Sequence, residues 1–440
     1  FKQKTAYEIR LSLVGSEMCI RDRKELRRVP LFHTFRDPHL PPFLLQDVAF
    51  DVLYCGICHT DVHFVKELAA SYPLTPGHEI AGVVTKVGRN VTKLRVGDSV
   101  AVGCMVDSCF GCRPCRSFEE QYCVNGAVWT YGGETKYGRA GPDGALTHGG
   151  YSDALVANQR FCFKLPSDAH GDEPKTNASL AKYAPLLCAG VTTFDPLVRY
   201  GCVAGNKRVG VCGFGGLGMM GVKLASSMHC DVVVLSTSPQ KKDSALTMGA
   251  SDFWVTTDAK AMAELAELAK ARIAAKEDFP VHGWQHPDAP RDSSGSASQK
   301  NDDASDCVCL DVILDTVSAP HDISALVDLL APDGTLVLLG LDTHPISVSQ
   351  NSLVFSRKVV RGSLIAGTKS TEACLEWCAS RDVFPEVRII GADEAADALK
   401  ALDKKNDAPV RYVIDCATIS QAAKGTAKGT TKTAKRSAAA

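Results

Sequence analysis

A glycine-rich turn between a predicted strand and a predicted helix is the feature that most constrains how this chain can fold. The turn follows the apolar run at residues 208–212 and opens the helical stretch at residues 217–228. Glycines let the backbone approach a ligand closely, and the first helical turn presents free N–H groups to a pyrophosphate. Between a strand and a helix, the motif predicts a dinucleotide site rather than a turn without a ligand. Its residues are Gly213, Phe214, Gly215, Gly216, Leu217 and Gly218.

The segments around this motif alternate between strand-like and helix-like patterns. The predicted strands cover residues 208–212, 231–236, 252–255, 308–314 and 334–340. The predicted helices cover residues 217–228, 239–248, 259–275 and 321–330. Such alternation predicts an α/β fold with a doubly wound parallel sheet. Short β-branched runs and glycine-rich turns fill residues 45–165 instead, so that region is predicted to be mainly β.

The end of the second predicted strand indicates which dinucleotide is bound. An NAD site would place an acidic residue there to hold the ribose 2′-hydroxyl. This chain has hydroxyl side chains and a nearby cation, which suit a 2′-phosphate, so NADP(H) is favoured over NAD(H). The residues concerned are Ser236, Thr237, Ser238 and Lys241. Lys241 and Lys242 could equally begin a solvated helix.

Four cysteines form a dense cluster in the predicted β region. They are Cys109, Cys112, Cys115 and Cys123. Four thiolates can close a tetrahedral structural zinc site and lock a loop that has little core of its own, although iron–sulfur ligation is formally possible. Cys104, just upstream, is expected to be an ordinary packed thiol. Most of the 18 cysteines lie singly on apolar segments, and together with metal-bound thiolates they indicate a reducing compartment, here the cytoplasm.

A second constellation of metal-binding side chains is spread along the same region. Cys55 and Cys58 have the spacing of a redox pair, but their mainly β context disfavours that function. His78 and Glu79 follow about twenty residues later. An open catalytic zinc site needs three protein ligands and a free fourth position. Cys58, His78 and a distant third cysteine could supply them.

Composition excludes several classes of partner. The formal net charge is -1, and no run of 18 uninterrupted apolar residues occurs, so neither nucleic acid nor a membrane is an expected partner. Three segments look foreign to a packed domain. They are an N-terminal extension at residues 1–32, a solvated insertion loop at 280–306 and a low-complexity basic tail at 418–440.

Taken together, these motifs resemble the zinc-containing medium-chain alcohol dehydrogenases, specifically the cinnamyl-alcohol-dehydrogenase-like branch. The resemblance covers roughly residues 43–416 in order. The shared strings lie at residues 58–63, 76–79, 109–123, 149–152, 187–192, 213–218, 236–238, 315–318 and 362–365. It implies a GroES-like mainly β catalytic domain at residues 33–190 plus 367–417 and a Rossmann NADP-binding domain at 191–366. It also implies an active site in the cleft between them, two zinc ions per chain and a homodimer.

The resemblance further implies roles for individual residues. Cys188 would be the third zinc ligand, and Glu79 the carboxylate that can approach the metal. Asp61 would orient His78, while Thr60 and His63 would relay the proton between substrate oxygen and solvent. The cofactor cleft would be lined by Thr60, Thr192, Thr316, Gly340, Ser363, Leu364 and Ile365.

The reaction implied is hydride transfer between NADP(H) and a primary alcohol/aldehyde pair. Trp129 and Leu364 match substrate-pocket positions, which favours an aromatic or medium aliphatic substrate. Three alternatives remain open from the sequence. An NAD-dependent zinc polyol dehydrogenase would usually have an acid at residues 236–238, and a zinc-free quinone or enoyl reductase would lack the Cys58, His78 and Cys188 set. A catalytically inactive NADPH- and zinc-binding redox sensor would bind the cofactor without turnover.

Overall fold

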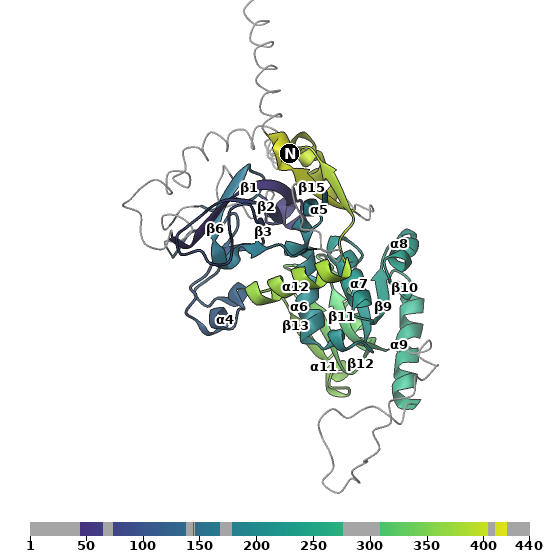
Figure 1. Ribbon diagram of the computed structural model, residues 1–440. Coiled ribbons are helices and arrows are strands. Elements are labelled where there is room, and N and C mark those ends of the chain that lie inside the picture. The colour runs from purple at the N-terminus through teal and green to yellow at the C-terminus, as the bar shows by residue number, and fades with distance from the viewer. Residues whose placement is uncertain are drawn as a thin grey trace, which may run out of the picture. The chain divides into compact units, whose positions relative to one another are not determined.

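The computed structural model describes residues 45–64, 74–137, 144, 146–167, 178–275, 309–403 and 410–419. The predicted N-terminal extension, the insertion loop and the tail beyond residue 419 lie outside the described residues. Two compact units are present (Figure 1). Unit 1 contains the described residues up to Val203, then Gly215–Met228 and those from Ser363 onward; unit 2 contains Ala204–Phe214 and His229–Gly362. The predicted domain boundaries near residues 190 and 367 stay a prediction.

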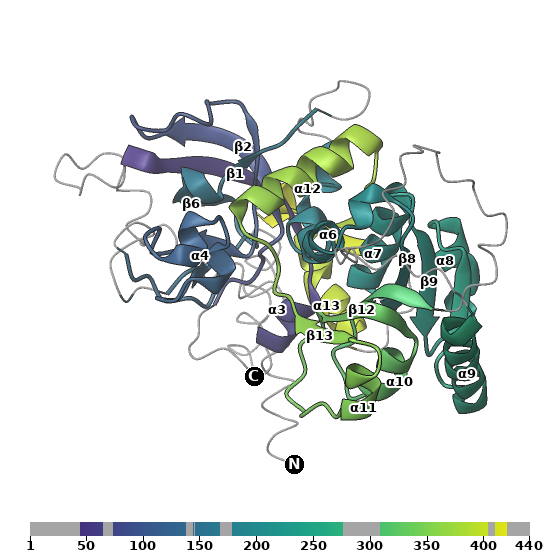
Figure 2. The ribbon, with the colours of Figure 1, turned by 90° about the horizontal axis from the view of Figure 1, so that it is seen from below.

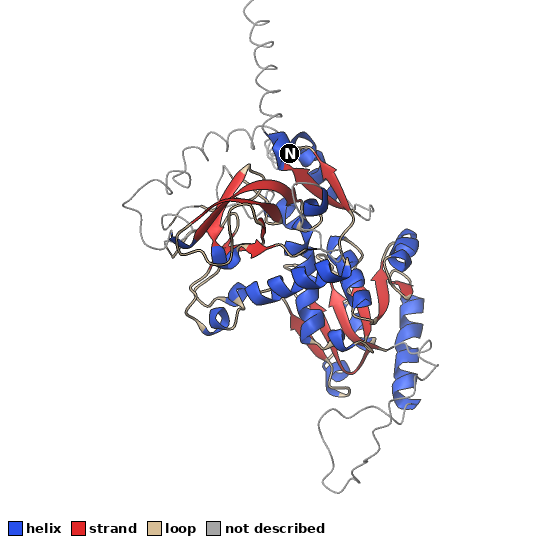
Figure 3. Ribbon diagram, viewed as in Figure 1, coloured by secondary structure: helices blue, strands red, loops and turns tan. Residues whose placement is uncertain are grey.

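Unit 1 is organised around a seven-stranded, largely antiparallel sheet (Figures 1 and 3). Its strand order is β14-β15-β1-β2-β3-β7, with β6 paired to β1. The strands are β1 (Asp47–Gly56), β2 (Ile80–Val87), β3 (Ser99–Val102), β6 (Ala154–Asn158), β7 (Phe163–Lys164), β14 (Val387–Ile390) and β15 (Arg411–Asp415). A separate two-stranded sheet joins β4 (Met105–Asp107) and β5 (Val128–Trp129).

The long strand β1 brings separate parts of unit 1 together. Its first half pairs with β6, and its last residues pair with β15, while β2 runs beside nearly its whole length. Cys55 pairs with Ile80, and the Gly56 amide donates to the Glu79 carbonyl at 2.8 Å. The residues that follow β1 therefore lie beside the residues that precede β2.

The helices of unit 1 pack around this sheet and against one another. They are α3 (His59–His63), α4 (Arg113–Arg116), α5 (Ala178–Ala181), α6 (Ala189–Arg199), α7 (Gly216–Ser227), α12 (Thr368–Arg381) and α13 (Ala395–Asp403). Helix α6 contacts both α7 and α12 (Figure 2). Short 3-10 turns include η4 (Glu120–Tyr122), η5 (Gln159–Phe161), η6 (Ala184–Leu187), η10 (Ala392–Glu394) and η11 (Cys416–Thr418). Buried valine, isoleucine and phenylalanine side chains from β1, β2 and β3 form the core.

Unit 2 contains a six-stranded sheet in which every pairing is parallel (Figure 3). The order β10-β9-β8-β11-β12-β13 is that of the dinucleotide-binding sheet, with β8 as its first strand. The strands are β8 (Arg208–Cys212), β9 (Asp231–Ser236), β10 (Asp252–Val255), β11 (Leu310–Asp315), β12 (Leu330–Leu338) and β13 (Val359–Gly362). The predicted parallel sheet is confirmed, and β8, β9 and β10 have the predicted bounds.

Some predicted bounds in unit 2 differ from the structure. The predicted helix at 239–248 divides into η8 (Pro239–Lys241) and α8 (Lys242–Thr247). Helix α10 (Ile323–Asp328) begins after Asp322, whose carboxylate caps it by accepting from the Ala325 amide. β12 starts at Leu330, which pairs with Leu310 ahead of a register shift. The remaining helices are α9 (Ala259–Ala275) and α11 (Gln350–Val354). No helix among the described residues combines the length and the apolarity that a bilayer crossing requires.

Candidate metal centres and cofactor residues

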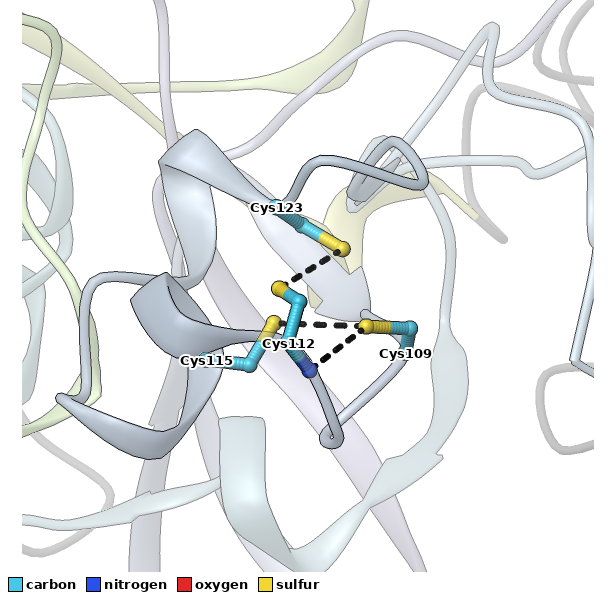
Figure 4. A group of neighbouring side chains, drawn as sticks. All are labelled: Cys109, Cys112, Cys115 and Cys123. Carbon is cyan, nitrogen blue, oxygen red and sulfur yellow. Dashed lines mark hydrogen bonds between the residues drawn. The ribbon is translucent and has the colours of Figure 1, made fainter.

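The four clustered cysteines surround a common point in unit 1 (Figure 4). The Sγ atoms of Cys109 and Cys115 are 3.9 Å apart, and those of Cys112 and Cys123 are also 3.9 Å apart. A tetrahedral zinc ion with Zn–S bonds of about 2.3 Å places its sulfur ligands about 3.8 Å from each other. The spacing of the sulfur atoms therefore fits a closed tetrahedral metal site.

The local chain conformation favours thiolates in this cluster. The Cys112 amide donates to Cys109 Sγ at 3.4 Å, and Phe110 between them adopts a left-handed φ of 59°. Although burial opposes it, N–H donors from Cys112 and from Gly111 lower the pKa of Cys109 to about 6. Burial raises the pKa of Cys115 to about 12. All four sulfurs can be thiolates together only when a cation balances their charge.

The second group of donors lies at the end of β1 in unit 1. Cys58, His78, Glu79 and Cys188 are all buried, and their ligand atoms lie within 4.8 Å of one another. Cys58 precedes α3, His78 and Glu79 precede β2, and Cys188 joins η6 to α6. The Sγ atoms of Cys58 and Cys188 are 3.7 Å apart, which again fits two ligands of one tetrahedral ion. The structure thus brings together the ligand set that the resemblance implies.

A buried carboxylate organises this second group. Asp61 accepts from the Cys58 amide at 2.8 Å and from the Gly77 amide at 3.2 Å. It also accepts from the Tyr131 hydroxyl at 2.6 Å and the Tyr151 hydroxyl at 3.1 Å. Nδ1 of His78 lies 3.5 Å from the same carboxylate, so Nε2 is the nitrogen available to a metal. The two tyrosines were not predicted from the sequence.

The titration of the paired thiols reflects their crowding. A hydrogen bond from Cys188, aided by the nearby imidazole of His78, lowers the pKa of Cys58. Hydrogen bonding with Cys104 and Cys58 raises the pKa of Cys188. Cys104, expected to be an ordinary packed thiol, donates to the Leu187 carbonyl at 3.8 Å, and a hydrogen bond with Cys188 lowers its pKa. These thiols share hydrogen bonds, and a bound cation would balance the charge of their thiolates in place of a shared proton.

Glu79 points away from bulk solvent and forms a buried ion pair with Arg411. Its Oε2 atom has no hydrogen-bond partner among the described residues, and a Cβ atom on Gly56 would collide with that oxygen. Burial raises the pKa of Glu79 to about 7, and Arg411 opposes the rise. A Cβ atom on Gly216 would collide with the guanidinium of Arg411. Arg411 therefore contacts both Glu79 and Gly216 of the glycine turn. In the sequence, the one signal for this role is an arginine in an otherwise apolar strand.

The predicted proton-relay residues lie on α3, directly after Cys58. The Thr60 hydroxyl is 3.5 Å from Cys58 Sγ. His63 ends the same helix, and its ring is tilted by 44° against that of His59, with ring centroids 4.9 Å apart. Thr192, buried in the first turn of α6, donates its amide to the Cys188 carbonyl at 3.0 Å. Thr60 and Thr192 thus flank Cys58 and Cys188, the two cysteines of this second group.

The predicted cofactor residues divide between the units. Those in unit 1 are Gly215, Gly216, Leu217 and Gly218 at the start of α7, with Ser363, Leu364 and Ile365 before α12. Those in unit 2 are Gly213, Phe214, Ser236, Thr237, Ser238, Lys241, Thr316 and Gly340.

The unit 2 members lie at the carboxyl ends of β8, β9, β11 and β12. Gly213 has a φ of 86° and leaves no room for a Cβ atom beside the Thr316 hydroxyl. Lys241 donates to the Phe214 carbonyl at 3.3 Å, and the Ser238 amide donates to the Ser236 hydroxyl at 3.2 Å. The hydroxyl-bearing turn and the glycine turn are therefore neighbours.

Two family models match the chain. The model described as alcohol dehydrogenase GroES-like domain matches residues 45–167, and the model described as zinc-binding dehydrogenase matches residues 216–380. NADP-dependent alcohol dehydrogenase C 1 of Mycolicibacterium smegmatis is 40% identical over 377 residues, 85% of this chain and 91% of that protein. The chain belongs to the zinc-binding alcohol dehydrogenase family.

Other members of this family support the assignment. Cinnamyl alcohol dehydrogenase 7 of Oryza sativa subsp. japonica is 38% identical over 387 residues, 86% of this chain and 89% of that protein. A solved cinnamyl alcohol dehydrogenase from Sorghum bicolor has a TM-score of 0.70 at 36% identity, covering 84% of this chain and 90% of that chain. The predicted family and the predicted two-domain α/β fold class are confirmed, and the protein is an oxidoreductase.

Proposed function

We propose that this protein is a zinc-dependent alcohol dehydrogenase that transfers a hydride between NADP(H) and a primary alcohol/aldehyde pair. The observation that supports it most is that the buried side chains of Cys58, His78 and Cys188 lie together. The Sγ atoms of Cys58 and Cys188 are 3.7 Å apart. Relatives named NADP-dependent alcohol dehydrogenase and a solved Helicobacter pylori enzyme complexed with NADP(H), 32% identical with a TM-score of 0.65, support the choice of reaction and cofactor.

We propose two zinc ions per chain with different duties. Cys109, Cys112, Cys115 and Cys123 would hold the first and close their loop. Cys58, His78 and Cys188 would hold the second, with Glu79 within reach as an alternative ligand. When bound there, zinc supplies Lewis-acid polarisation of the substrate oxygen.

The chain's own residues would then orient the donors and move the proton. Asp61 fixes the tautomer and orientation of His78 through its contact with Nδ1. Thr60, beside Cys58, would take the first place in a proton path from the substrate oxygen, and His63 would pass that proton to solvent. Arg411 would offer its guanidinium to the pyrophosphate at the start of α7, where it abuts Gly216.

The preference for NADP(H) is assigned to the hydroxyl-rich turn after β9. Ser236, Thr237, Ser238 and Lys241 would receive the 2′-phosphate, which a carboxylate in this turn would repel. Replacement of Lys241 by alanine is expected to raise the KM for NADPH about tenfold, the order of one charge-assisted hydrogen bond. The KM for NADH should stay unchanged, and steady-state kinetics with both cofactors would measure the difference.

Substrate class, assembly and location are further parts of the proposal. Trp129 and Leu364, both partly buried, would favour an aromatic or medium aliphatic aldehyde. A homodimer is supported by the outer position of β13 in its sheet and by the neighbouring Val354 and Phe355, which are 64% and 84% exposed. Light scattering of the wild type and of Phe355→Asp tests the dimer. Thiolate ligands suit a reducing compartment, and we propose the cytoplasm.

The experiment that tests the function is an aldehyde panel with NADPH and with NADH, on protein of measured zinc content. The proposal expects turnover of aromatic or medium aliphatic aldehydes with NADPH preferred, and about two zinc ions per chain. Polyol oxidation with NAD preferred would favour the polyol dehydrogenase alternative. NADPH binding without turnover across the panel would favour a redox sensor.

A further inference from the structure

A short segment before α12 connects to the cysteine cluster through hydrogen bonds rather than through the sheet. The cysteine lobe is defined here as residues 109–123, and the connecting segment as residues 363–368. The Leu364 amide donates to the Tyr122 hydroxyl at 3.1 Å. The Thr368 amide donates to one carboxylate oxygen of Glu120 at 2.9 Å, and the Thr368 hydroxyl donates to the other at 3.0 Å.

The Glu120 carboxylate accepts hydrogen bonds both from the connecting segment and from Arg160, and these bonds form the junction between the lobe and the segment. Its side chain is fully buried, and the guanidinium of Arg160 donates to the same carboxylate from Nε at 2.9 Å and from Nη2 at 2.6 Å. Arg160 also donates to the Cys115 carbonyl at 2.6 Å, which ties the carboxylate to a lobe cysteine. The carboxylate faces the first turn of the fourteen-residue helix α12, where a negative charge is favourable.

The connecting segment holds a backbone conformation that it would not adopt unaided. Ile365 is β-branched, yet its φ is 38°, in the left-handed region that favours glycine. Gly367 packs so closely on the Phe118 carbonyl that a Cβ atom there would collide with it. Tyr122 restrains the chain on one side of Ile365, and Glu120 restrains it on the other. Strained residues of this kind persist when the surrounding contacts over-determine them, and they cluster at ligand sites.

We propose that Glu120 and Tyr122 are positioning residues for the cofactor, acting through residues Ser363–Ile365. The inference rests on the proposed function, in which Ser363, Leu364 and Ile365 contact NADP(H). The cysteine lobe would then have two roles. It would stabilise its own loop, and it would hold the backbone of the cofactor segment in its binding conformation, so that loosening the junction weakens NADPH binding while both metals stay bound.

The test compares Tyr122→Phe with Tyr137→Phe. Tyr122→Phe removes the acceptor of the Leu364 amide. Tyr137→Phe removes a hydroxyl that donates to the Asn125 and Gly126 carbonyls at 2.9 and 2.6 Å and lies 3.9 Å from Cys123 Sγ, so it alters the surroundings of a lobe cysteine and keeps the Tyr122–Leu364 bond. A second pair is Thr368→Val, which deletes the hydroxyl bond to Glu120, and Thr368→Ser, which keeps it. The readouts are the NADPH dissociation constant by fluorescence, zinc content by mass spectrometry and both KM values.

Tyr122→Phe and Thr368→Val are expected to raise the dissociation constant and the KM for NADPH about three- to tenfold, the ratio that corresponds to one hydrogen bond. Zinc content and the properties of Tyr137→Phe and Thr368→Ser should stay at the wild-type level. An unchanged NADPH dissociation constant in Tyr122→Phe overturns the inference. So does a rise accompanied by zinc loss or shared by Tyr137→Phe, because the role is then structural. If wild-type protein binds no NADPH, the proposed function fails first.

Discussion

The two cysteine-containing centres of unit 1 have similar sulfur spacing but opposite construction. The cluster between residues 109 and 123 is assembled from one short stretch, is partly exposed and includes an N–H···S bond within its own loop. The open group is assembled from Cys58, His78 and Cys188, is buried and depends on Asp61 for its order. Under the proposed function, the local cluster would stabilise the loop around it, whereas the centre built from distant residues would leave one position open for chemistry.

Removal of a ligand of the open group is expected to have the largest effect on activity. Cys58→Ser should lower kcat by at least about 10³-fold, since Lewis-acid polarisation is worth several kcal/mol. Zinc content should fall by about one ion per chain, with the lobe ion retained. Steady-state kinetics and metal analysis on the same sample measure both effects.

Cys55→Ala is the matched control for this change, because Cys55 is a buried thiol in the same C-x-x-C pair but outside the ligand group. It should keep both zinc ions and turnover within a few-fold of wild type. Loss of activity in Cys55→Ala with zinc retained would instead favour the redox-pair alternative.

Removal of a lobe ligand should have a different effect. Cys112→Ser is expected to destabilise the protein by roughly 3 kcal/mol or more, which lowers Tm by roughly 5–15 °C. The kcat of the remaining folded protein should change much less than in Cys58→Ser. Scanning calorimetry and kinetics at low temperature separate the two quantities. A Cys112→Ser protein with wild-type Tm would mean that the lobe does not need its metal.

A smaller effect is expected from the network behind His78. Asp61→Asn should weaken zinc binding at the open group about 10- to 100-fold, the usual cost of losing a partner of a metal-bound histidine. Tyr131→Phe, which deletes one of the two tyrosine donors, should cost less. Chelator competition measures both affinities. Equal zinc affinity in Asp61→Asn and wild type would show that Asp61 does not order the site.

The smallest effect concerns a third group that only resembles a metal centre. Cys212, Asp315 and His321 lie within ligand distance of one another, yet both ring nitrogens of His321 already face acceptors. They are the Ala319 carbonyl at 2.8 Å and the Asp315 carboxylate at 3.0 Å. Because both ring nitrogens face these acceptors, the imidazole is poorly placed to bind a metal, and we expect two zinc ions rather than three.

The hydrogen bond with Asp315, helped by the nearby charge of Asp342, raises the pKa of His321. A raised folded-state pKa stabilises the fold fully below the unfolded value of about 6.5, and the stabilisation is lost as pH rises through the folded value. His321→Gln should thus lower the free energy of unfolding by a few tenths to about 1 kcal/mol at pH 6. Denaturant titrations at pH 6 and pH 9 test this, and a larger difference at pH 9 would contradict it.

Elements with a continuous local pattern could be predicted from the sequence. The bounds of β8, β9 and β10 agree with the prediction because each is a short, mostly apolar run between turn residues. The four lobe cysteines were predicted as one site because they are close in sequence. Cys188 could be placed only by family resemblance, since it lies 130 residues from Cys58. The pairing of Arg411 with Glu79, 332 residues apart, and the tyrosines around Asp61 depend on tertiary packing that no local pattern encodes.

Anomalous diffraction at the zinc edge tests the central claim most directly, because it locates the ions without reference to activity. The account predicts two peaks per chain in crystals of the purified protein. One should be enclosed by Cys109, Cys112, Cys115 and Cys123, and the other should lie within bonding distance of Cys58 Sγ, Cys188 Sγ and a ring nitrogen of His78. A single peak in the lobe, with no metal beside Cys58 and Cys188 in zinc-supplemented protein that still turns over aldehyde, would contradict it.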